Sequence, residues 1–392
     1  MNLDQLEKLT ANWNYPTNIR LGLGRISELA DSCKELNMQR PLLVTDPGLA
    51  DLPMVLDAVQ NCGKQGLECN VFSKIVGNPT GENVDDGVLA YQKGKHDGVI
   101  AFGGGSALDA AKAIALMVGQ DRSLWDFEDV GDNWSRVNTD KMAPVVAVPT
   151  TSGTGSEVGR ASVITDTKHH LKRIIFHPKM LPAIVILDPQ LTVGLPPHLT
   201  AATGMDAFSH ALEAYCATYY HPMAEGIALE AIRLVKNYLP RATRNGQDLE
   251  ARTQIMVAST MGATAFQRGL GGMHALAHSL GALYNSHHGL LNAILMPYVL
   301  KANRSAIESS IERLARYLEL PDATFDGFLQ WVVELRAELG IPHTLKDIGI
   351  EGEQAEIVAK MAVNDPSAGG NPIIFTAEQY AVIFAASISG EL

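Results

Sequence analysis

The chain has 392 residues, of which 46% are hydrophobic and 19% are charged, and its formal net charge at pH 7 is −12. This length suffices for two domains with sizeable cores, and this balance is ordinary for a soluble globular protein. The acidic charge and the lack of a long basic run argue against nucleic acid and anionic membranes as partners.

The N-terminal segment and the cysteines indicate in which cellular compartment the protein is expected. Residues 1–15 carry charges throughout and have no apolar core, so they do not resemble a signal peptide. No apolar run reaches the roughly 18 residues that a membrane span needs. The four cysteines show no CxxC or zinc-finger spacing. We therefore expect reduced thiols in a cytoplasmic protein without a membrane partner.

Short apolar strands alternate with helical patterns in the first half of the chain. Near-continuous apolar strands indicate a parallel sheet that is covered on both faces. The first three strands begin about thirty residues apart, which is the length of a βαβ unit. We expect strands at Pro41–Thr45, Val71–Ile75, Gly98–Phe102, Pro144–Val148 and Ile184–Leu187, with helical patterns such as Leu49–Asn61 and Val84–Lys95 between them. Residues 1–194 are therefore predicted to form an α/β domain.

The third of these units carries a glycine loop. The strand Gly98–Phe102 runs into Gly103, Gly104, Gly105 and Ser106, and a strong helix former follows. Glycines let the backbone approach a phosphate, and the free N–H groups of a helix N-terminus favour an anion. The loop departs from the standard dinucleotide fingerprint, because Leu108 replaces its third glycine and because the loop follows the third strand rather than the first. A tight structural turn is the alternative interpretation.

Two further features favour a dinucleotide. Asp46 ends the first predicted strand, at the carboxyl edge where open α/β sheets bind ligands. A carboxylate there can accept ribose hydroxyls and would repel a 2′-phosphate, although a turn-capping aspartate gives the same pattern. The segment Pro149–Glu157, PTTSGTGSE, is rich in hydroxyls and glycines and suits a polar ligand, although a polar turn has the same composition.

From about Leu195 the pattern changes to long helical segments, and Pro196-Pro197 marks the junction. We expect helices at Ala201–Tyr219, Met223–Tyr238, Leu249–Phe266, Ile307–Tyr317, Phe325–Leu339 and Ala377–Ile388. Residues 195–392 are therefore predicted to form an all-helical domain.

The first of these helices carries a candidate metal pair. Asp206 and His210 are four residues apart and share one helical face, where a carboxylate and an imidazole can both reach one divalent ion. A hydrogen bond between the two side chains is the simpler alternative. The pair gains weight because a second group of histidines lies in the same domain, and bundle metal sites use ligands from separate helices.

That second group lies within residues 269–298. His274 and His278 share a helical face, and His287 and His288 follow them. A continuous helix would hold His274 and His288 about 21 Å apart, too far for one ion. A shared site therefore requires a break between Tyr284 and Gly289. Satisfied core histidines are the alternative, and the spacing does not choose between His274 and His278 or between His287 and His288.

Four segments together resemble the signatures of the iron-containing (group III) alcohol dehydrogenases. They are GGGSALDAAKAIA, PTTSGTGSE, GMDAFSHALEAY and HALAHSLGALYNSHHGLLNAILMPYV, and they occur in the family's order over almost the whole chain. The resemblance implies the dehydroquinate synthase-like fold, with an N-terminal dinucleotide-binding domain (1–194), a helical metal-binding domain (195–392) and an active site in the cleft between them.

The resemblance also implies the site residues. The implied metal ligands are Asp206, His210, His274 and His288, and His278 matches a family histidine that lies near the metal and the nicotinamide without being a ligand. The implied cofactor residues are Asp46 at the adenosine ribose, Gly103, Gly104, Gly105 and Ser106 at the pyrophosphate, and Asn78, Asp109, Thr150, Thr151, Thr154 and Lys172 nearby.

The implied activity is reversible hydride transfer between an alcohol and its aldehyde or ketone. The metal would act as a Lewis acid, and His278 is the candidate to pass the proton to solvent. We expect Fe²⁺, with Zn²⁺ possible because three histidines and a carboxylate also suit zinc. Asp46 favours NAD over NADP. We also expect a homodimer or larger homo-oligomer.

Three other activities remain open. The first is a specialised reductase of lactaldehyde, a hydroxy-acid semialdehyde or a diol. The second is a hydroxyacid–oxoacid transhydrogenase, which keeps its nicotinamide bound. The third, a non-enzymatic metal-binding protein, is disfavoured because metal storage needs no dinucleotide site.

The chain departs from the family pattern at two positions. His287 stands where the family often has proline or another residue, and no role is assigned to it. Asn371-Pro372-Ile373 replaces the NPR that the family often shows. The missing arginine weakens any inference of substrate specificity from the family.

Overall fold

The computed structural model describes residues 17–169 and 171–392. These residues form two compact units, 17–194 and Leu195–Leu392, and each unit has its own hydrophobic core. The units divide where the sequence pattern changes from strands to helices. The expectation about residues 1–15 concerns a segment outside the described residues.

Within its described residues, the first unit contains a sheet of six parallel strands in the order β1-β8-β5-β4-β2-β3. The strands are β1 (Asn18–Leu21), β2 (Pro41–Val44), β3 (Asn70–Phe72), β4 (Gly98–Gly103), β5 (Val145–Pro149) and β8 (Ile184–Leu187). All five predicted strands are present. The additional strand, β1, lies at the sheet edge and is partly exposed, so it lacks the apolar run that marks the others.

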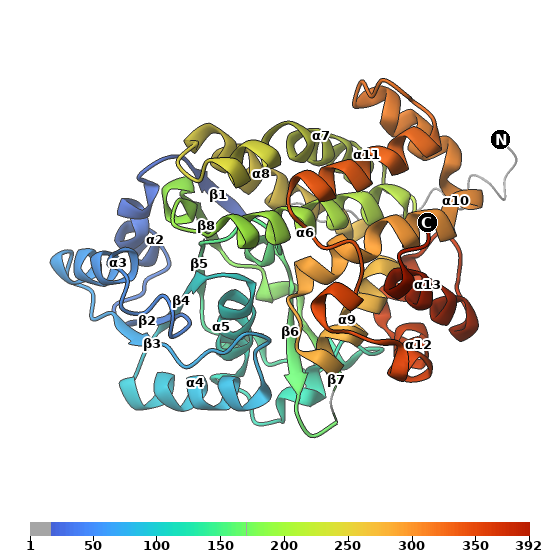
Figure 1. Ribbon diagram of the computed structural model, residues 1–392. Coiled ribbons are helices and arrows are strands. Elements are labelled where there is room, and N and C mark those ends of the chain that lie inside the picture. Colours follow the sequence, from blue (N-terminus) through green and yellow to red (C-terminus); the bar gives the residue numbers. More distant parts are fainter. Residues whose placement is uncertain (1–16, 170) are drawn as a thin grey trace, which may run out of the picture. The chain divides into compact units, whose positions relative to one another are not determined.

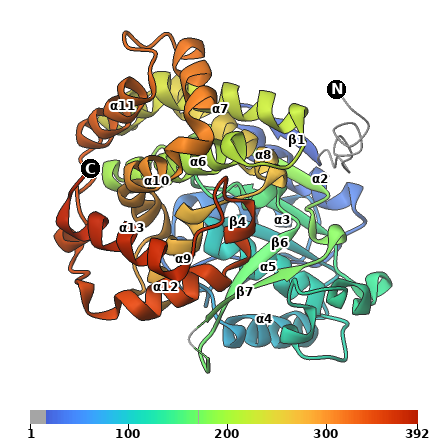
Figure 2. The same cartoon turned by 90° about the vertical axis from the view of Figure 1, so that its right-hand side faces the viewer.

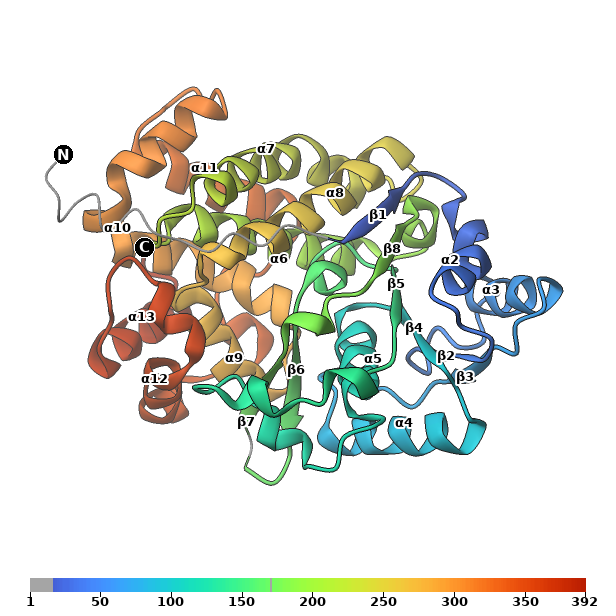
Figure 3. The same ribbon diagram turned by 180° about the vertical axis from the view of Figure 1, so that it is seen from behind.

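Helices cover both faces of this sheet, which confirms the predicted α/β architecture. They are α2 (Leu29–Glu35), α3 (Pro53–Lys64), α4 (Gly81–Gly94) and α5 (Gly105–Met117). Leu29 of α2 and Val55 of α3 share a core with Leu43 and Ile100 of the sheet. Figures 1 and 3 show α2 and α3 on one side of the sheet and α4 and α5 on the other.

Several predicted boundaries in this unit differ from the observed ones by up to a few residues, and two of these differences have a clear local cause. β3 ends at Phe72 rather than Ile75, because it is an edge strand whose one partner among the described strands, β2, ends at Val44. α3 begins at Pro53 rather than Leu49, because the preceding residues form a turn around Asp46.

A two-stranded antiparallel hairpin, which the sequence did not predict, also belongs to this unit. It consists of β6 (Ala161–Asp166) and β7 (Leu171–Phe176), and Figure 2 shows the two strands side by side. Alternate residues of β6 are buried. The strands mix apolar with charged residues, so the hairpin gives no continuous apolar signal.

The second unit is helical throughout its described residues, as predicted. Its helices are α6 (Pro197–Cys216), α7 (Pro222–Arg244), α8 (Leu249–Ala265), α9 (Gly272–Tyr284), α10 (His288–Tyr317), α11 (Phe325–Glu338), α12 (Ala355–Asn364) and α13 (Ala377–Ser389). α6 packs against α7, α8 and α10, while α9 packs against α10 and α12 (Figure 2). The predicted helix Ile307–Tyr317 is the end of α10, which is 30 residues long.

Two expectations from composition can be compared with the structure. None of the helices in residues 17–169 and 171–392 is long and apolar enough to cross a membrane. The four cysteines all lie in these ranges and are free thiols, with Cys33 and Cys62 buried.

Candidate metal centre

The break between α9 and α10 brings distant histidines together. α9 ends at Tyr284, Asn285 adopts a left-handed conformation with φ of 51°, and α10 begins at His288. The centroids of the His274 and His288 rings are consequently 5.3 Å apart. The turn that a shared metal site requires is therefore present.

His287, which had no assigned role, caps α10. Its Nδ1 accepts a hydrogen bond from the backbone N–H of Leu290 at 3.4 Å, and its side chain is exposed. A side-chain acceptor at this position satisfies one of the free N–H groups of the first helical turn. The doubled histidine thus has one member at the helix cap and one, His288, at the candidate metal centre.

Close packing of α10 on α6 positions His288. A Cβ atom added to Gly289 would lie 2.3 Å from the Ala202 carbonyl oxygen and 2.9 Å from the Asp206 Cβ. Only glycine permits this approach, which places His288 Nε2 3.6 Å from Asp206 Oδ1. Gly289 was predicted as a turn residue, but it serves the contact between the two helices.

The four predicted metal ligands converge. One potential ligand atom from each of Asp206, His210, His274 and His288 lies within 4.8 Å of the others. The first three side chains are buried, and the His288 side chain is 23% exposed. The His210 and His274 rings stack at 4.8 Å. One carboxylate and three imidazoles fit a divalent transition-metal ion, so the residues present match the group that the resemblance implies.

Glu213, at the end of α6, orients His274. The His274 Nδ1–H donates to Glu213 Oε2 at 2.6 Å, which leaves Nε2 as the ring's electron-pair donor. The same carboxylate accepts from the backbone N–H groups of Gly271 and Met273 at 2.8 and 2.7 Å. Burial lowers the pKa of His274, but the Glu213 carboxylate outweighs burial and raises that pKa above its ordinary value.

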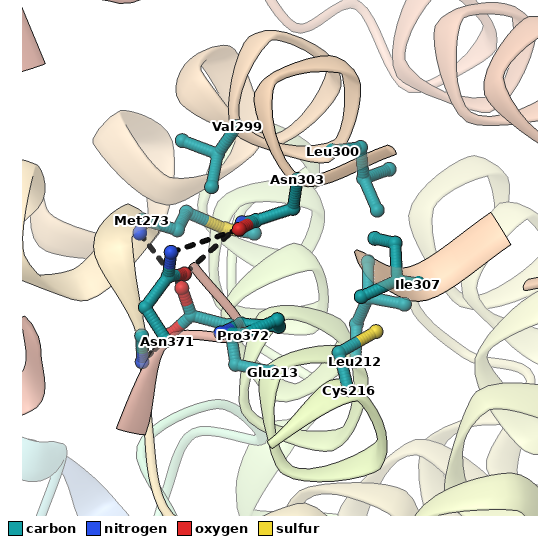
Figure 4. A pocket seen from close by; sticks show the side chains of 11 residues that line it. Leu212, Glu213, Cys216, Met273, Val299, Leu300, Asn303, Ile307, Asn371 and Pro372 are labelled. Carbon is teal, nitrogen blue, oxygen red and sulfur yellow. Dashed lines mark hydrogen bonds between the residues drawn. The ribbon is translucent and has the colours of Figure 1, made fainter. Parts of the chain in front are cut away.

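Asn371 holds the first turn of α9 from the other side. Its Oδ1 accepts from the backbone N–H of Gly272 at 2.9 Å, and its amide pairs with that of Asn303 through bonds of 3.0 and 2.9 Å. Figure 4 shows the two amides facing each other at the wall of a cavity of about 20 Å³. Ile373, at the position of the absent arginine, packs against the core.

His278 lies beside the four converging residues without joining them. Its ring stacks on that of His288 at 5.2 Å, and its Nδ1–H donates to Asp365 Oδ2 at 2.9 Å. Burial raises the pKa of Asp365, but the charge and the hydrogen bond of His278, together with hydrogen bonds from Ser367, outweigh burial and hold that pKa below its usual range. Asp365 is therefore a carboxylate that fixes one ring nitrogen of His278.

Among the described residues, three side chains that hydrogen-bond to the candidate ligands or to His278 were not predicted: Glu213, Asp365 and Asn292. Glu213 lies seven residues after Asp206 on the same face of α6, so helical spacing contained a signal. Asn292 lies one turn after His288 on α10, which is a weaker signal. Asp365 is 87 residues from His278 in sequence, and no local pattern connects them.

In the first unit, Asp46 and the glycine loop lie at the switch point of the sheet. β2 and β4 are neighbours, and their connections run to opposite sides of the sheet, which is where open α/β sheets bind ligands. Asp46 follows β2, and Gly103 ends β4. One carboxylate oxygen of Asp46 accepts from the N–H groups of Gly48 and Leu49 at 2.8 and 3.1 Å, so the aspartate also shapes the turn.

The predicted threonines gather at the N-terminus of α5, which follows the loop. The Thr150 N–H donates to the Gly103 carbonyl at 2.9 Å. A Cβ on Gly104 would lie 3.4 Å from Thr151, and one on Gly105 would lie 2.4 Å from Thr154. Ser106 is the second residue of α5. The glycines therefore admit threonine side chains as well as a close approach by a ligand.

Asn78 and Lys172 also meet, whereas Asp109 has structural partners. Lys172 Nζ donates to Asn78 Oδ1 at 2.8 Å. The Asp109 carboxylate accepts from Ser156 Oγ at 2.5 Å and from the Val163 N–H at 2.9 Å. It also forms an ion pair with the buried lysine one turn along α5. Asp109 thus ties the polar loop and the hairpin to α5.

Comparisons with known proteins agree with this geometry. A family model described as iron-containing alcohol dehydrogenase matches residues 16–189, and one described as Fe-containing alcohol dehydrogenase family, C-terminal, matches residues 200–388. The chain is 40% identical over 376 residues to 4-hydroxybutyrate dehydrogenase of Cupriavidus necator, covering 93% of this chain and 97% of that relative. It is 34% identical over 382 residues to NAD-dependent methanol dehydrogenase of Bacillus methanolicus, covering 95% and 98%. A solved structure of 1,3-propanediol oxidoreductase has a TM-score of 0.92 at 33% identity and covers 97% of this chain and 100% of that one.

Proposed function

Because the chain belongs to the iron-containing alcohol dehydrogenase family, we propose that it is a metal- and NAD-dependent dehydrogenase that interconverts an alcohol with its aldehyde or ketone. The observation that carries this proposal is the convergence of Asp206, His210, His274 and His288 from three helices. Ion binding explains why three buried or half-buried imidazoles gather around one buried carboxylate.

The protein's own side chains support catalysis in two ways. A divalent ion held by the four residues would supply Lewis acidity toward the alcohol oxygen. Glu213 keeps the proton of His274 on Nδ1 and so presents Nε2 to the ion. Asp365 likewise holds the proton of His278 on Nδ1, which leaves Nε2 of His278 to exchange a proton with its surroundings.

We propose NAD as the preferred acceptor. Asp46 stands at the carboxyl edge of the sheet, where its charge opposes a 2′-phosphate, and the N-terminus of α5 suits a pyrophosphate. The name of the Bacillus methanolicus relative, an NAD-dependent enzyme, supports this choice. Asp46→Ala should reduce the ratio of kcat/KM for NAD to that for NADP, measured in steady state. Equal kcat/KM values with both cofactors in the unmodified enzyme would count against the proposal.

We propose a substrate with a primary hydroxyl group. The relatives are named for 4-hydroxybutyrate, methanol and 1,3-propanediol, and each of these compounds has at least one primary hydroxyl group. A hydroxy acid is the second candidate, because the relative at 40% identity is named for one. Steady-state kinetics on a panel of simple alcohols, diols and hydroxy acids would rank these classes.

The central experiment compares protein reconstituted anaerobically with Fe²⁺, protein reconstituted with Zn²⁺, and metal-stripped protein. We expect alcohol-dependent formation of free NADH in at least one reconstituted form and none in the stripped form. A transhydrogenase would oxidise the alcohol without accumulating free NADH. Cytoplasmic location and a homo-oligomeric state stay predictions, which fractionation and light scattering would test.

A further inference from the structure

The amide of Asn292 is inserted among the candidate metal ligands. Asn292 is fully buried on α10, and its Nδ2 donates to Asp206 Oδ1 at 2.9 Å. The same nitrogen lies 3.2 Å from Nε2 of His274 and 3.2 Å from Nε2 of His288. Its Oδ1 has no hydrogen-bond partner among the described residues. One nitrogen atom therefore contacts three of the four predicted ligands.

We propose that Asn292 is a positioning residue that fixes the Asp206 carboxylate and preassembles the ligand set for its ion. This inference rests on the proposed metal site and adds a residue that the ligand set does not contain. Asn292 does not bind the ion in this account; it acts through the ligands that its amide contacts.

The hydrogen bond from Asn292 restricts the rotation of a buried carboxylate. Asp206 is buried, and a buried carboxylate without donors carries a large desolvation cost. A charge-assisted hydrogen bond to Oδ1 meets part of that cost and restricts rotation about the Cβ–Cγ bond. Asn292 therefore determines how many carboxylate oxygens Asp206 presents to an ion and in which direction they point.

Before an ion binds, Asn292 also supplies a hydrogen-bond donor beside the imidazole nitrogens. His274 donates its Nδ1–H to Glu213, so its Nε2 lone pair faces Asp206 and the neighbouring imidazoles. Several electron pairs crowded into a buried site repel one another unless a donor lies among them. The two amide hydrogens of Asn292 provide that donor, and the ion would take over the imidazole lone pairs on binding.

Asparagine suits position 292 better than leucine, aspartate or glutamine. Leucine has nearly the same shape as asparagine but no donor, and aspartate would place a second carboxylate against Asp206. Glutamine is longer by one methylene and would overpack a fully buried position. The contact is possible because Gly289 lets α10 approach α6, so a side chain as short as that of asparagine reaches Asp206.

The test compares Asn292→Leu with the unmodified chain. We expect the affinity for Zn²⁺, measured by competition with a chelator, to fall by about 10–100-fold. We also expect the visible ligand-field spectrum of the Co²⁺-loaded variant to change, because a freed Asp206 carboxylate alters the coordination. The control is Ile311→Ala, a buried site about 28 Å farther along α10, which should lower thermal stability without changing either metal readout.

A second variant keeps the proposal falsifiable if Asn292→Leu does not fold. Asn292→Asp preserves size but replaces the donor with a charge beside Asp206. Without metal it should melt at a lower temperature than the unmodified chain, and Zn²⁺ should raise its melting temperature by more than it raises that of the unmodified chain.

The outcomes separate this inference from the proposed function. If the wild type binds metal and oxidises alcohol, the proposed function stands. If Asn292→Leu then has the same Zn²⁺ affinity and Co²⁺ spectrum as the wild type, the proposed role of Asn292 is refuted. Equal metal-free melting temperatures for Asn292→Asp and the wild type would likewise refute it. A wild type that binds neither ion overturns both.

Discussion

Three side chains around the candidate centre orient its histidines and aspartate without belonging to the ligand set. Glu213 bonds His274, Asp365 bonds His278, and Asn292 contacts Asp206. Such partners fix the tautomer and direction of a ligand, and their loss typically lowers metal affinity by about 10–100-fold. Much of the centre's specificity is therefore expected to reside in residues that never touch the ion.

Glu213 offers a direct test of this idea. Three donors converge on its two oxygens, and glutamine would keep one oxygen while turning an NH₂ group toward the others. Glu213→Gln should weaken Zn²⁺ binding by about 10–100-fold and destabilise the protein by about 1–3 kcal/mol. Chelator competition and urea unfolding measure the two effects. Glu334→Gln, on the exposed surface of α11, is the control, and an unchanged Zn²⁺ affinity for Glu213→Gln would contradict the assignment.

Between elements, the contact of α10 with α6 decides whether the centre can form. Gly289→Ala would force a Cβ to within 2.3 Å of the Ala202 carbonyl, so the helices must separate. We expect a loss of about 1–3 kcal/mol of stability together with reduced metal content, measured by urea unfolding and by elemental analysis.

Gly226→Ala provides the matched control for that substitution. Gly226 lies within α7, and a Cβ there would meet nothing within 4 Å. The same change should therefore leave metal content unaltered and raise stability by up to about 1 kcal/mol. If both glycine variants retain full metal content, the packing of α10 on α6 does not control the centre.

The β6–β7 hairpin supplies a prediction about pH. Burial raises the pKa of Asp166, but hydrogen bonds from His169 and Arg173 outweigh burial and hold that pKa below its unfolded value of 3.8. A lowered folded-state pKa contributes stability that is present above the unfolded value and is lost as pH falls through the folded-state value. Asp166→Asn should thus cost about 1 kcal/mol at neutral pH.

Urea unfolding of both proteins as a function of pH measures that contribution. The difference in the free energy of unfolding should stay constant from pH 7 to the region of the unfolded pKa and should shrink below it. A difference that is the same at all pH values would show that the carboxylate charge does not hold the hairpin.

At the scale of the whole molecule, strong local sequence patterns predicted the two structural units. The apolar strands and the long helical segments gave the α/β unit and the helical unit, because burial on both faces or along one face leaves a periodic trace. The i,i+4 pairs indicated candidate ligands, and the family resemblance selected Asp206, His210, His274 and His288 among them. The resemblance was confirmed by family models that match residues 16–189 and 200–388.

The rest depended on contacts that no local pattern records. β1 pairs with β8, which lies more than 160 residues later, and its few apolar residues gave no strand signal. Asp109, which the resemblance implies lies near the cofactor, also bonds Ser156 and Val163, far along the chain. Asp365 meets His278 only through the packing of distant segments. Tertiary contacts of this kind determine which polar groups already have hydrogen-bond partners. These contacts are visible only in the folded chain.

Metal binding should also appear in the stability of the whole protein. The ligands come from α6, α9 and α10, so an ion that binds only the folded chain ties three helices together. At a free ion concentration of 100 times its Kd, the gain is about 2.7 kcal/mol. Thermal scans with and without Zn²⁺ should show this shift, and His274→Ala should abolish it. A shift of equal size in His274→Ala would place the ion elsewhere.

The most direct test of the central claim is the rate of NADH formation from a primary alcohol, measured against the amount of metal bound per chain. We predict that metal-stripped protein is inactive and that activity returns in proportion to Fe²⁺ or Zn²⁺ added, up to one ion per site. Full activity in protein that contains no bound metal would contradict the account.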